Sequence, residues 1–321
     1  MEQFARILKL LGHPDRLRIL ALLRRGELTV SELVSVMELS QPRVTQYVKS
    51  LEDAGIVDRL REGSWVFSRL RSDGDAVSSL VRGVLKQLPS ADPILAADRN
   101  RLEDVRASRA TRAERFFADV ANNRGQLSHE FLPKSRVEAM ILAQLGDRTF
   151  DFMVDLGTGS GRILALLADR VRRGTGVDLS PDMLRVARYT LRDERFGHLF
   201  VQQSDLCQTP LADGVADLVT VHQVLHHLDQ PVDALSEAMR LLRPDGVLLV
   251  VDFAEHEREE FRDQYAHRRL GFSEREIADQ IGASDFHNVV CTRVDASDAD
   301  HPDLLVWRAT RTTTRTPELV T

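Results

Sequence analysis

Residues 150–161 read FDFMVDLGTGSG, and this stretch decides the fold of the second half of the chain. Five of its first seven residues are apolar, a pattern that is typical of a buried strand. Glycines at positions 157, 159 and 161 let the backbone turn sharply and pass close to a ligand. Apolar residues from Ile163 to Leu167 then predict a helix. Strand, glycine loop and helix in this order form an arrangement that binds nucleotides.

The next predicted strand, residues 176–179, carries an acid at its end. Asp178 stands 21 positions after Gly157. In dinucleotide-binding folds an acid at this place accepts hydrogen bonds from both hydroxyls of a ribose. A glycine loop alone is a weak sign of a nucleotide site, and the acid at the strand end strengthens it.

Strands and helices continue to alternate towards the C-terminus. After a helix that starts at Ser180, the pattern predicts strands over 198–203, 216–222 and 247–251 and a helix over 231–242. Two late strands, 289–294 and 304–309, are close enough in sequence to form an antiparallel hairpin. The expected fold is α/β, with a doubly wound and mostly parallel sheet in a Rossmann-like domain.

The segments DLGTGSG, GVDLS, SDL, ADLVTVHQVLHHL and LLRPDGVLLVVDF occur in this order. In this respect the stretch from about 115 to 310 resembles the class I S-adenosylmethionine-dependent methyltransferases. Dinucleotide binding is the rival interpretation. It is disfavoured because the loop reads GTGSG rather than GxGxxG, and because the later segments are present.

The resemblance implies a site for S-adenosylmethionine or S-adenosylhomocysteine. The glycine loop would meet the methionine part of the ligand, Asp178 the ribose, and His222 and Gln223 the sulfonium end. Leu179 and Met183 would flank the adenine, while Asp205 and Leu206 would lie at its edge. The implied cofactor residues are Asp155, Gly157, Thr158, Gly159, Gly161, Asp178, Leu179, Met183, Asp205, Leu206, His222 and Gln223.

Other chemical candidates are weaker, and we assign neither a catalytic residue nor a metal ligand. His222, His226 and His227 can be a metal or acid/base cluster, but a helix-entry motif of small-molecule methyltransferases is the favoured interpretation. Cys207 and Cys291 are expected to be packed thiols. The segment 255–271 is either a flap over an acceptor or an ordinary charged surface helix.

The first 70 residues predict a winged helix-turn-helix. Helical apolar spacing covers 2–11, and Pro14 opens a second helix. Thr29 and Glu32 form a capping box for a third helix that should bury Leu33, Val34 and Met37. A fourth helix is expected over 41–54 with Ser40 as its N-cap, followed by strands over 56–60 and 65–70.

The segments LGHPDRLRILALL and TVSELVSVMELSQPRVTQYVKSLEDAGIV, with the wing after them, resemble the ArsR family of bacterial repressors. The resemblance covers residues 2–72. It implies a homodimer on an inverted repeat of double-stranded operator DNA, with the first helix and a helix in 74–88 at the dimer seam. No metal site is expected here, because the third helix lacks a cysteine pair and residues 74–88 lack histidine. The fourth helix would enter the major groove and the wing would reach phosphates or the minor groove. The predicted DNA contacts are Ser40, Gln41, Arg43, Thr45, Gln46, Lys49, Arg59, Arg61 and Arg69.

Composition and charge agree with two domains. The 321 residues are 43% hydrophobic and 29% charged, and two cysteines cannot build a disulfide scaffold. Residues 1–148 carry a formal charge of +4 and residues 149–321 carry −10, so a polyanion would prefer the first half. We expect a winged-helix domain over 1–88, a helical connector over 89–148, a methyltransferase-like domain over 149–310 and a flexible tail over 311–321.

The combination leaves two functions open. In one, the second domain senses S-adenosylhomocysteine or S-adenosylmethionine and changes operator affinity. In the other, it methylates a small molecule while the first domain regulates transcription. The fusion resembles SahR-like regulators of the methionine cycle, which favours the sensor. The chain is expected to be cytoplasmic, because it has neither a signal peptide nor an apolar run long enough to span a membrane.

Overall fold

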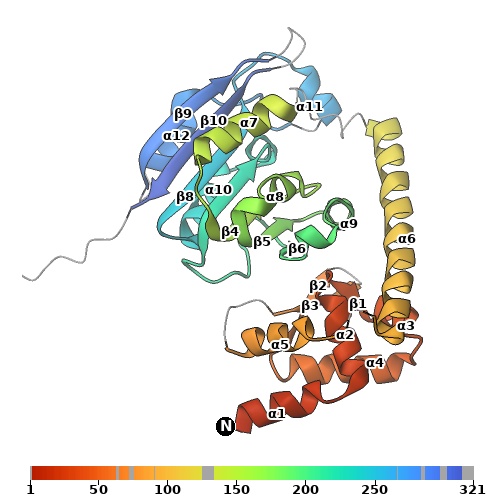
Figure 1. Cartoon of the computed structure of the whole chain (residues 1–321). Coiled ribbons are helices and arrows are strands. Elements are labelled where there is room, and N and C mark those ends of the chain that lie inside the picture. The colour runs from red at the N-terminus through yellow and green to blue at the C-terminus, as the bar shows by residue number, and fades with distance from the viewer. Residues whose placement is uncertain are drawn as a thin grey trace, which may run out of the picture.

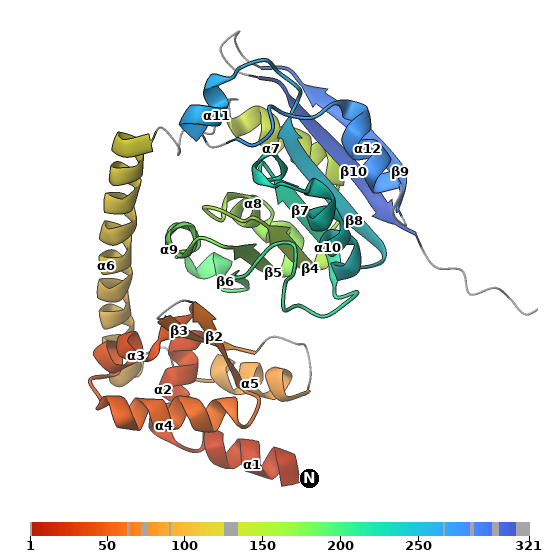
Figure 2. The ribbon, with the colours of Figure 1, turned by 180° about the vertical axis from the view of Figure 1, so that it is seen from behind.

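The structure is a computed structural model. It describes residues 2–62, 65–71, 76–89, 91–124, 134–265, 267–282, 286–296 and 302–312. The predicted wing turn at 63–64 and the tail beyond residue 312 lie outside the described residues. Figures 1 and 2 show the chain from two sides, with a small helical half, a long helix and a larger half built around a sheet. Within the described part, no helix has the length and hydropathy to cross a membrane.

The first half is a winged helix-turn-helix, as predicted. A three-stranded antiparallel sheet with the order β1-β3-β2 packs beside five helices. The elements are α1 (Glu2–Leu11), α2 (Pro14–Leu23), β1 (Leu28–Thr29), α3 (Val30–Met37), α4 (Gln41–Glu52), β2 (Val57–Glu62), β3 (Trp65–Leu70) and α5 (Ala76–Lys86).

Most local signals of the first half are confirmed. The capping box at α3 is complete, because Thr29 Oγ1 accepts a hydrogen bond from Glu32 N and the Glu32 carboxylate accepts one from Thr29 N. One detail was wrong. Val36 rather than Val34 is buried, because α3 turns its 33, 36 and 37 positions inward. Ser40 is the N-cap of α4, as predicted, and its side chain makes no capping hydrogen bond.

The predicted long helix is α6 (Pro93–Arg124), which rises beside both halves in Figure 1. Its first turns dock on the winged helix through Asp98, which is 1% exposed. Both carboxylate oxygens of Asp98 accept hydrogen bonds from Arg18 of α2, at 2.7 and 2.8 Å. The same helix α6 also packs against α9 of the second half. The helix therefore contacts both domains.

The second half is a seven-stranded sheet with the order β6-β5-β4-β7-β8-β10-β9. The first five strands are parallel, and β10 and β9 form the predicted antiparallel hairpin. The strands are β4 (Phe150–Leu156), β5 (Val171–Asp178), β6 (Leu199–Gln203), β7 (Ala216–His222), β8 (Leu242–Phe253), β9 (Phe286–Val294) and β10 (Leu304–Arg311).

Helices cover both faces of this sheet, so the domain has three layers. One apolar cluster joins a sheet face to α7, α8, α9 and α11, and a second joins the other face to α10 and α12. The helices are α7 (Lys134–Leu145), α8 (Arg162–Leu166), α9 (Pro181–Thr190), α10 (Pro231–Leu241), α11 (Glu260–Tyr265) and α12 (Glu274–Gly282). Three short 3-10 turns complete it: η1 (Ala168–Arg170), η2 (Glu194–Phe196) and η3 (Leu225–His227).

Candidate functional site

The glycine loop joins the carboxyl end of β4 to α8 and has a backbone path that requires glycine. Gly157, Gly159 and Gly161 have φ angles of 73°, 51° and 75°, in the region that side chains disfavour. A Cβ on Gly157 would lie 2.6 Å from Cγ2 of Val224. The positive φ angles favour glycine at all three positions, and the contact with Val224 leaves no room for a side chain at Gly157. The loop lies at the edge of the sheet where parallel α/β folds bind ligands.

Asp178 ties the loop to the end of β5. Its carboxylate accepts hydrogen bonds from the backbone N–H of Gly159 at 2.9 Å and of Ser180 at 2.8 Å. Burial raises the pKa of Asp178, and the two backbone donors oppose that rise. Each carboxylate oxygen retains acceptor capacity for a further donor. Asp178 is therefore placed to hold the loop and to receive a hydroxyl of a ligand.

Asp155 lies beneath the loop and supports it. It is 1% exposed and accepts hydrogen bonds from Thr158 Oγ1 at 2.7 Å and Thr220 Oγ1 at 2.5 Å. Burial raises its pKa to about 6, although both threonine hydroxyls act to lower it. Asp155 thus fixes Thr158 from below the loop.

The residues predicted to surround adenine follow the carboxyl ends of β5 and β6, and Met183 lies in the first turn of α9. Leu179 is 60% exposed, an unusual position for a large apolar side chain beside a glycine loop. The Cε of Met183 would lie 3.6 Å from a Cβ on Gly159, so Met183 borders the loop. Asp205 is exposed and accepts a hydrogen bond from Cys207 N, while Leu206 is buried. Leu179 and Asp205 are therefore exposed near the glycine loop, whereas Leu206 belongs to the core.

His222 is the last residue of β7, and Gln223 follows it at the same edge. Gln223 has a φ of 52°, and its N–H donates to the Val251 carbonyl at 2.7 Å. A glutamine in this left-handed conformation marks local strain of the kind found at binding sites. Burial lowers the pKa of His222 to about 4, and its buried Nε2 has no hydrogen-bond partner among the described residues. The imidazole is therefore neutral at physiological pH.

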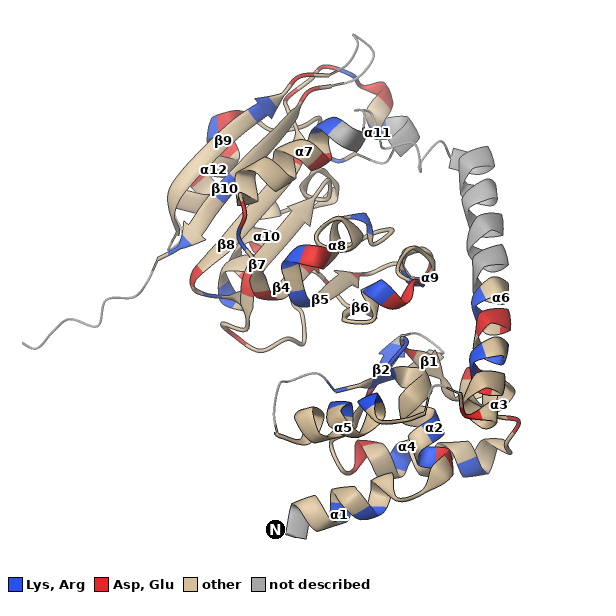
Figure 3. Cartoon of the chain, in the orientation of Figure 1, with Lys and Arg blue, Asp and Glu red and all other residues tan. Residues whose placement is uncertain are grey.

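The predicted DNA-binding side chains of α4 are exposed. The outward set consists of Gln41, Arg43, Thr45, Gln46 and Lys49. Their exposure leaves them available to the edges of bases or to phosphates. Figure 3 shows basic residues on both α4 and β2.

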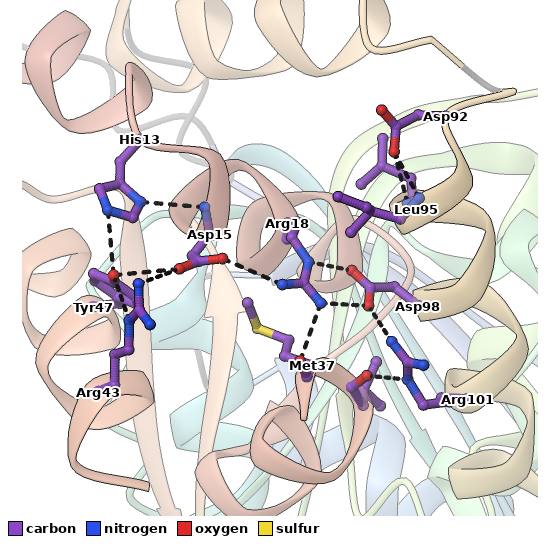
Figure 4. A network of polar contacts seen from close by, with 12 residues as sticks. His13, Asp15, Arg18, Met37, Arg43, Tyr47, Asp92, Leu95, Asp98 and Arg101 are labelled. Atoms are coloured by element: carbon purple, nitrogen blue, oxygen red, sulfur yellow. Dashed lines mark hydrogen bonds and ion pairs between the residues drawn. The ribbon is translucent and has the colours of Figure 1, made fainter. Parts of the chain in front are cut away.

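Arg43 belongs to a polar network that begins at α4. Its Nε donates to Tyr47 Oη at 2.9 Å, and its guanidinium pairs with Asp15 at 3.1 Å. Asp15 also pairs with Arg18, which in turn binds Asp98 of α6 (Figure 4). The network links the predicted recognition helix to the long helix, and no local pattern in the sequence predicts this connection.

The three predicted wing arginines differ in their surroundings. Arg59 and Arg61 are exposed on β2. The Arg69 guanidinium instead lies 5.2 Å from the ring centre of Phe200, which belongs to β6 of the second half. Arg69 therefore lies at the contact between the domains, so the wing assignment rests on Arg59 and Arg61.

Two further groups were not predicted. Arg188 of α9 forms an ion pair with Glu27 of the first half, and the two side chains are 5% and 7% exposed. His267 lies beside His226 and His227, with its ring centre 4.0 Å from that of His226. No spacing rule relates residues this far apart in sequence. Sequence analysis singled out His267 only as part of the candidate flap over 255–271, and not as a neighbour of His226 and His227.

Comparison with known proteins assigns a family to each half. Residues 13–59 match the family model of the bacterial regulatory proteins of the arsR family. Residues 154–250 match the model of a methyltransferase domain. The chain joins an arsR-family domain to a methyltransferase domain.

Individual relatives match one domain each. The arsR-family domain is 41% identical over 71 residues to the biofilm growth-associated repressor of Agrobacterium fabrum, covering 22% of this chain and 61% of that protein. The methyltransferase domain is 33% identical over 137 residues to the malonyl-[acyl-carrier protein] O-methyltransferase of Enterobacter lignolyticus, covering 43% and 52%. The chain spans between 33% and 63% of the length of the curated relatives that it matches.

Solved structures similar to this chain include methyltransferases and the [4+2]-cyclase SpnF. The N-methyltransferase NodS from Bradyrhizobium japonicum, in complex with S-adenosyl-L-homocysteine, is 19% identical with a TM-score of 0.49. The alignment covers 62% of this chain and 98% of that one.

Proposed function

We propose that this protein is a transcriptional regulator whose methyltransferase domain senses S-adenosylhomocysteine or S-adenosylmethionine and thereby controls genes of the methionine and methyl cycle. One observation carries the proposal. Helix α9 begins at the candidate nucleotide site, where Ser180 caps it, and carries Arg188 near its other end against the arsR-family domain. A ligand at one end of α9 thus has a direct mechanical connection to the DNA-binding half.

The contact at the far end of α9 is buried and specific. Arg188 pairs with Glu27, and its guanidinium lies 3.8 Å from the ring centre of Phe67 on β3. Close to the glycine loop, a Cβ on Gly161 would lie 3.1 Å from Cβ of Ala187. A shift of the loop on ligand binding would therefore press on α9 one residue before Arg188. Packed contacts of this kind transmit small displacements between sites.

A second connection leads to the recognition helix. Helix α9 packs against α6, so a displacement of α9 would also move α6. It would thereby strain the hydrogen bonds between Asp98 of α6 and Arg18 of α2. From Arg18 the polar network continues through Asp15 to Arg43 of α4. Both connections, through Arg188 and through α6, would then change the orientation of α4, the helix proposed to meet DNA.

The DNA-bound form would be a homodimer on an inverted repeat. Helix α1 exposes Phe4 and Leu8, which are 42% and 55% exposed, and these residues offer an apolar seam for a second copy. The proposed partners are thus operator DNA, a second chain and an S-adenosyl nucleotide, and the proposed location is the cytoplasm.

Of the two nucleotides we favour S-adenosylhomocysteine as the effector. It is the product that remains after methyl transfer, so its accumulation signals a stalled methyl cycle. The second candidate function is methyl transfer to a small molecule. It is favoured by the strained Gln223 and the neutral His222 at the expected sulfonium end.

Operator binding measured with each nucleotide separates the two functions. Fluorescence anisotropy with DNA from upstream of the protein's own gene should show an affinity that changes with S-adenosylhomocysteine. Asp178→Ala should bind the same DNA equally well but no longer respond. An unchanged DNA affinity with either nucleotide, together with turnover on a small acceptor, would favour the enzyme.

A further inference from the structure

Three histidine rings converge at the edge of the sheet where β7 and β8 end. His226 and His227 belong to η3, and His267 comes from the segment that follows α11. One ring nitrogen from each lies within 4.8 Å of the other two. The ring centre of His226 is 4.1 Å from that of His227 and 4.0 Å from that of His267. His222, grouped with them on sequence grounds, is not part of this convergence.

Backbone contacts hold the two segments in place. The N–H groups of Arg268 and Arg269 both donate to the His226 carbonyl, at 3.0 and 3.2 Å. Further on, Gly271 passes so close to the Ala254 carbonyl that a Cβ there would overlap it. The position of His267 beside η3 is therefore fixed by main chain and does not depend on the imidazoles themselves.

The surroundings of His226 resemble those of a metal ligand. Its Nδ1 lies 2.7 Å from Asp252 Oδ1, and the two side chains are 1% and 0% exposed. A carboxylate on one nitrogen of an imidazole fixes the tautomer and directs the other nitrogen to a metal. Here the other nitrogen, Nε2, is buried and has no hydrogen-bond partner among the described residues. Leaving such an atom unsatisfied is costly, and a bound cation would remove that cost.

Asp252 is well suited to this supporting role. It also accepts hydrogen bonds from the backbone N–H of Leu225 and of Phe253, at 2.9 and 2.8 Å. These two backbone donors hold the Asp252 carboxylate in place beside Nδ1 of His226.

We propose that His226, His227 and His267 bind one Zn²⁺-class divalent cation, with Asp252 as the positioning residue. Neutral imidazoles favour borderline metals such as zinc. Tetrahedral Zn–N bonds of about 2.0–2.1 Å place neighbouring nitrogens roughly 3.4 Å apart, so small side-chain rotations from the observed positions complete the site. Three protein ligands leave a fourth position for water or a ligand. The ion would also clamp the 255–271 segment to the sheet edge.

Metal titration of the full-length protein tests this proposal without reference to the nucleotide. After treatment with a chelator, Co²⁺ should bind at one ion per chain with the intense visible absorption of a tetrahedral site, and Zn²⁺ should displace it. His227→Ala and His267→Gln should each weaken binding by at least about tenfold. His287→Ala, on β9, is the control and should bind as the parent does.

The alternative is a purely structural cluster, since His226 and His267 also pack against Phe253. No saturable binding by the parent protein, or only the weak spectrum of octahedral Co²⁺, would overturn the proposal. Binding that survives both His227→Ala and His267→Gln would overturn it as well. The parent spectrum decides the matter even if a variant fails to fold.

Discussion

Arg188 of the methyltransferase domain forms a buried ion pair with Glu27 of the arsR-family domain, and the ring of Phe67 lies against the guanidinium. Removing one partner of a buried pair leaves the other charge without that compensation, at a cost of about 3–5 kcal/mol. Arg188→Ala should therefore lower the free energy of unfolding and uncouple the domains. Arg185→Ala, an exposed change on the same helix, is the matched control.

The double variant Glu27→Gln, Arg188→Met separates stability from coupling. Because it removes both charges, much of the lost stability should return while the nucleotide response of DNA binding stays absent. Denaturant unfolding and operator titration measure the two effects. If Arg188→Ala kept both its stability and its response, the pair would not be the connection between the domains.

Asp178→Asn tests the nucleotide site. Loss of a hydrogen bond to a charged acceptor costs about 1.5–3 kcal/mol, so calorimetry should show affinity for S-adenosylhomocysteine falling by roughly 10- to 150-fold. Asp182→Asn changes an acid on the same side of the domain, on α9, and should bind normally. Equal affinity for the parent and Asp178→Asn would remove Asp178 from the site.

Gln46 and Lys49 are exposed on α4 and should affect DNA binding in different ways. Gln46→Ala should relax base preference at one position, costing about 1–3 kcal/mol there. Lys49→Ala should weaken binding to all sequences and reduce the dependence of log K on log salt by about one unit. Competition assays across salt concentrations measure both. A neutral outcome for both variants would place the DNA interface elsewhere.

Two groups with shifted pKa values, His222 and Asp155, should change the free energy of unfolding in opposite directions as the pH falls. The pKa of His222 is lowered from 6.5 to about 4 in the folded protein. Between these pH values the unfolded chain binds a proton that the folded protein does not bind. The folded state therefore loses stability as the pH falls from 6.5 to 4. This loss amounts to at most about 3 kcal/mol. The pKa of Asp155 is raised to about 6, so its contribution is lost as pH rises through that value.

Denaturant unfolding from pH 7 to pH 4 measures both contributions. Relative to the parent, His222→Asn should gain stability as the pH falls, and Asp155→Asn should lose it. The comparison between variants cancels the titration of the other carboxylates. Parallel pH profiles for all three proteins would mean that neither group carries the expected shift.

Local signals predicted most of the fold because each depends on neighbours in the chain. The capping box at Thr29, the glycine loop and the strand that ends at Asp178 are such signals. The burial of Val36 in place of Val34 depends on what packs against α3, which no local pattern contains. The candidate site follows the same rule. Local strand patterns indicated Asp178 and His222. The ion pair between Arg188 and Glu27 could not be predicted, because it forms only where the two domains pack together.

The most direct test of the sensor proposal is calorimetry of S-adenosylhomocysteine binding to the free protein and to its operator complex. Coupling between two sites is reciprocal, so the nucleotide affinities must differ by the same factor by which the nucleotide changes operator affinity. The proposal predicts a factor of about 5–150. Identical nucleotide affinities in the two states would contradict it.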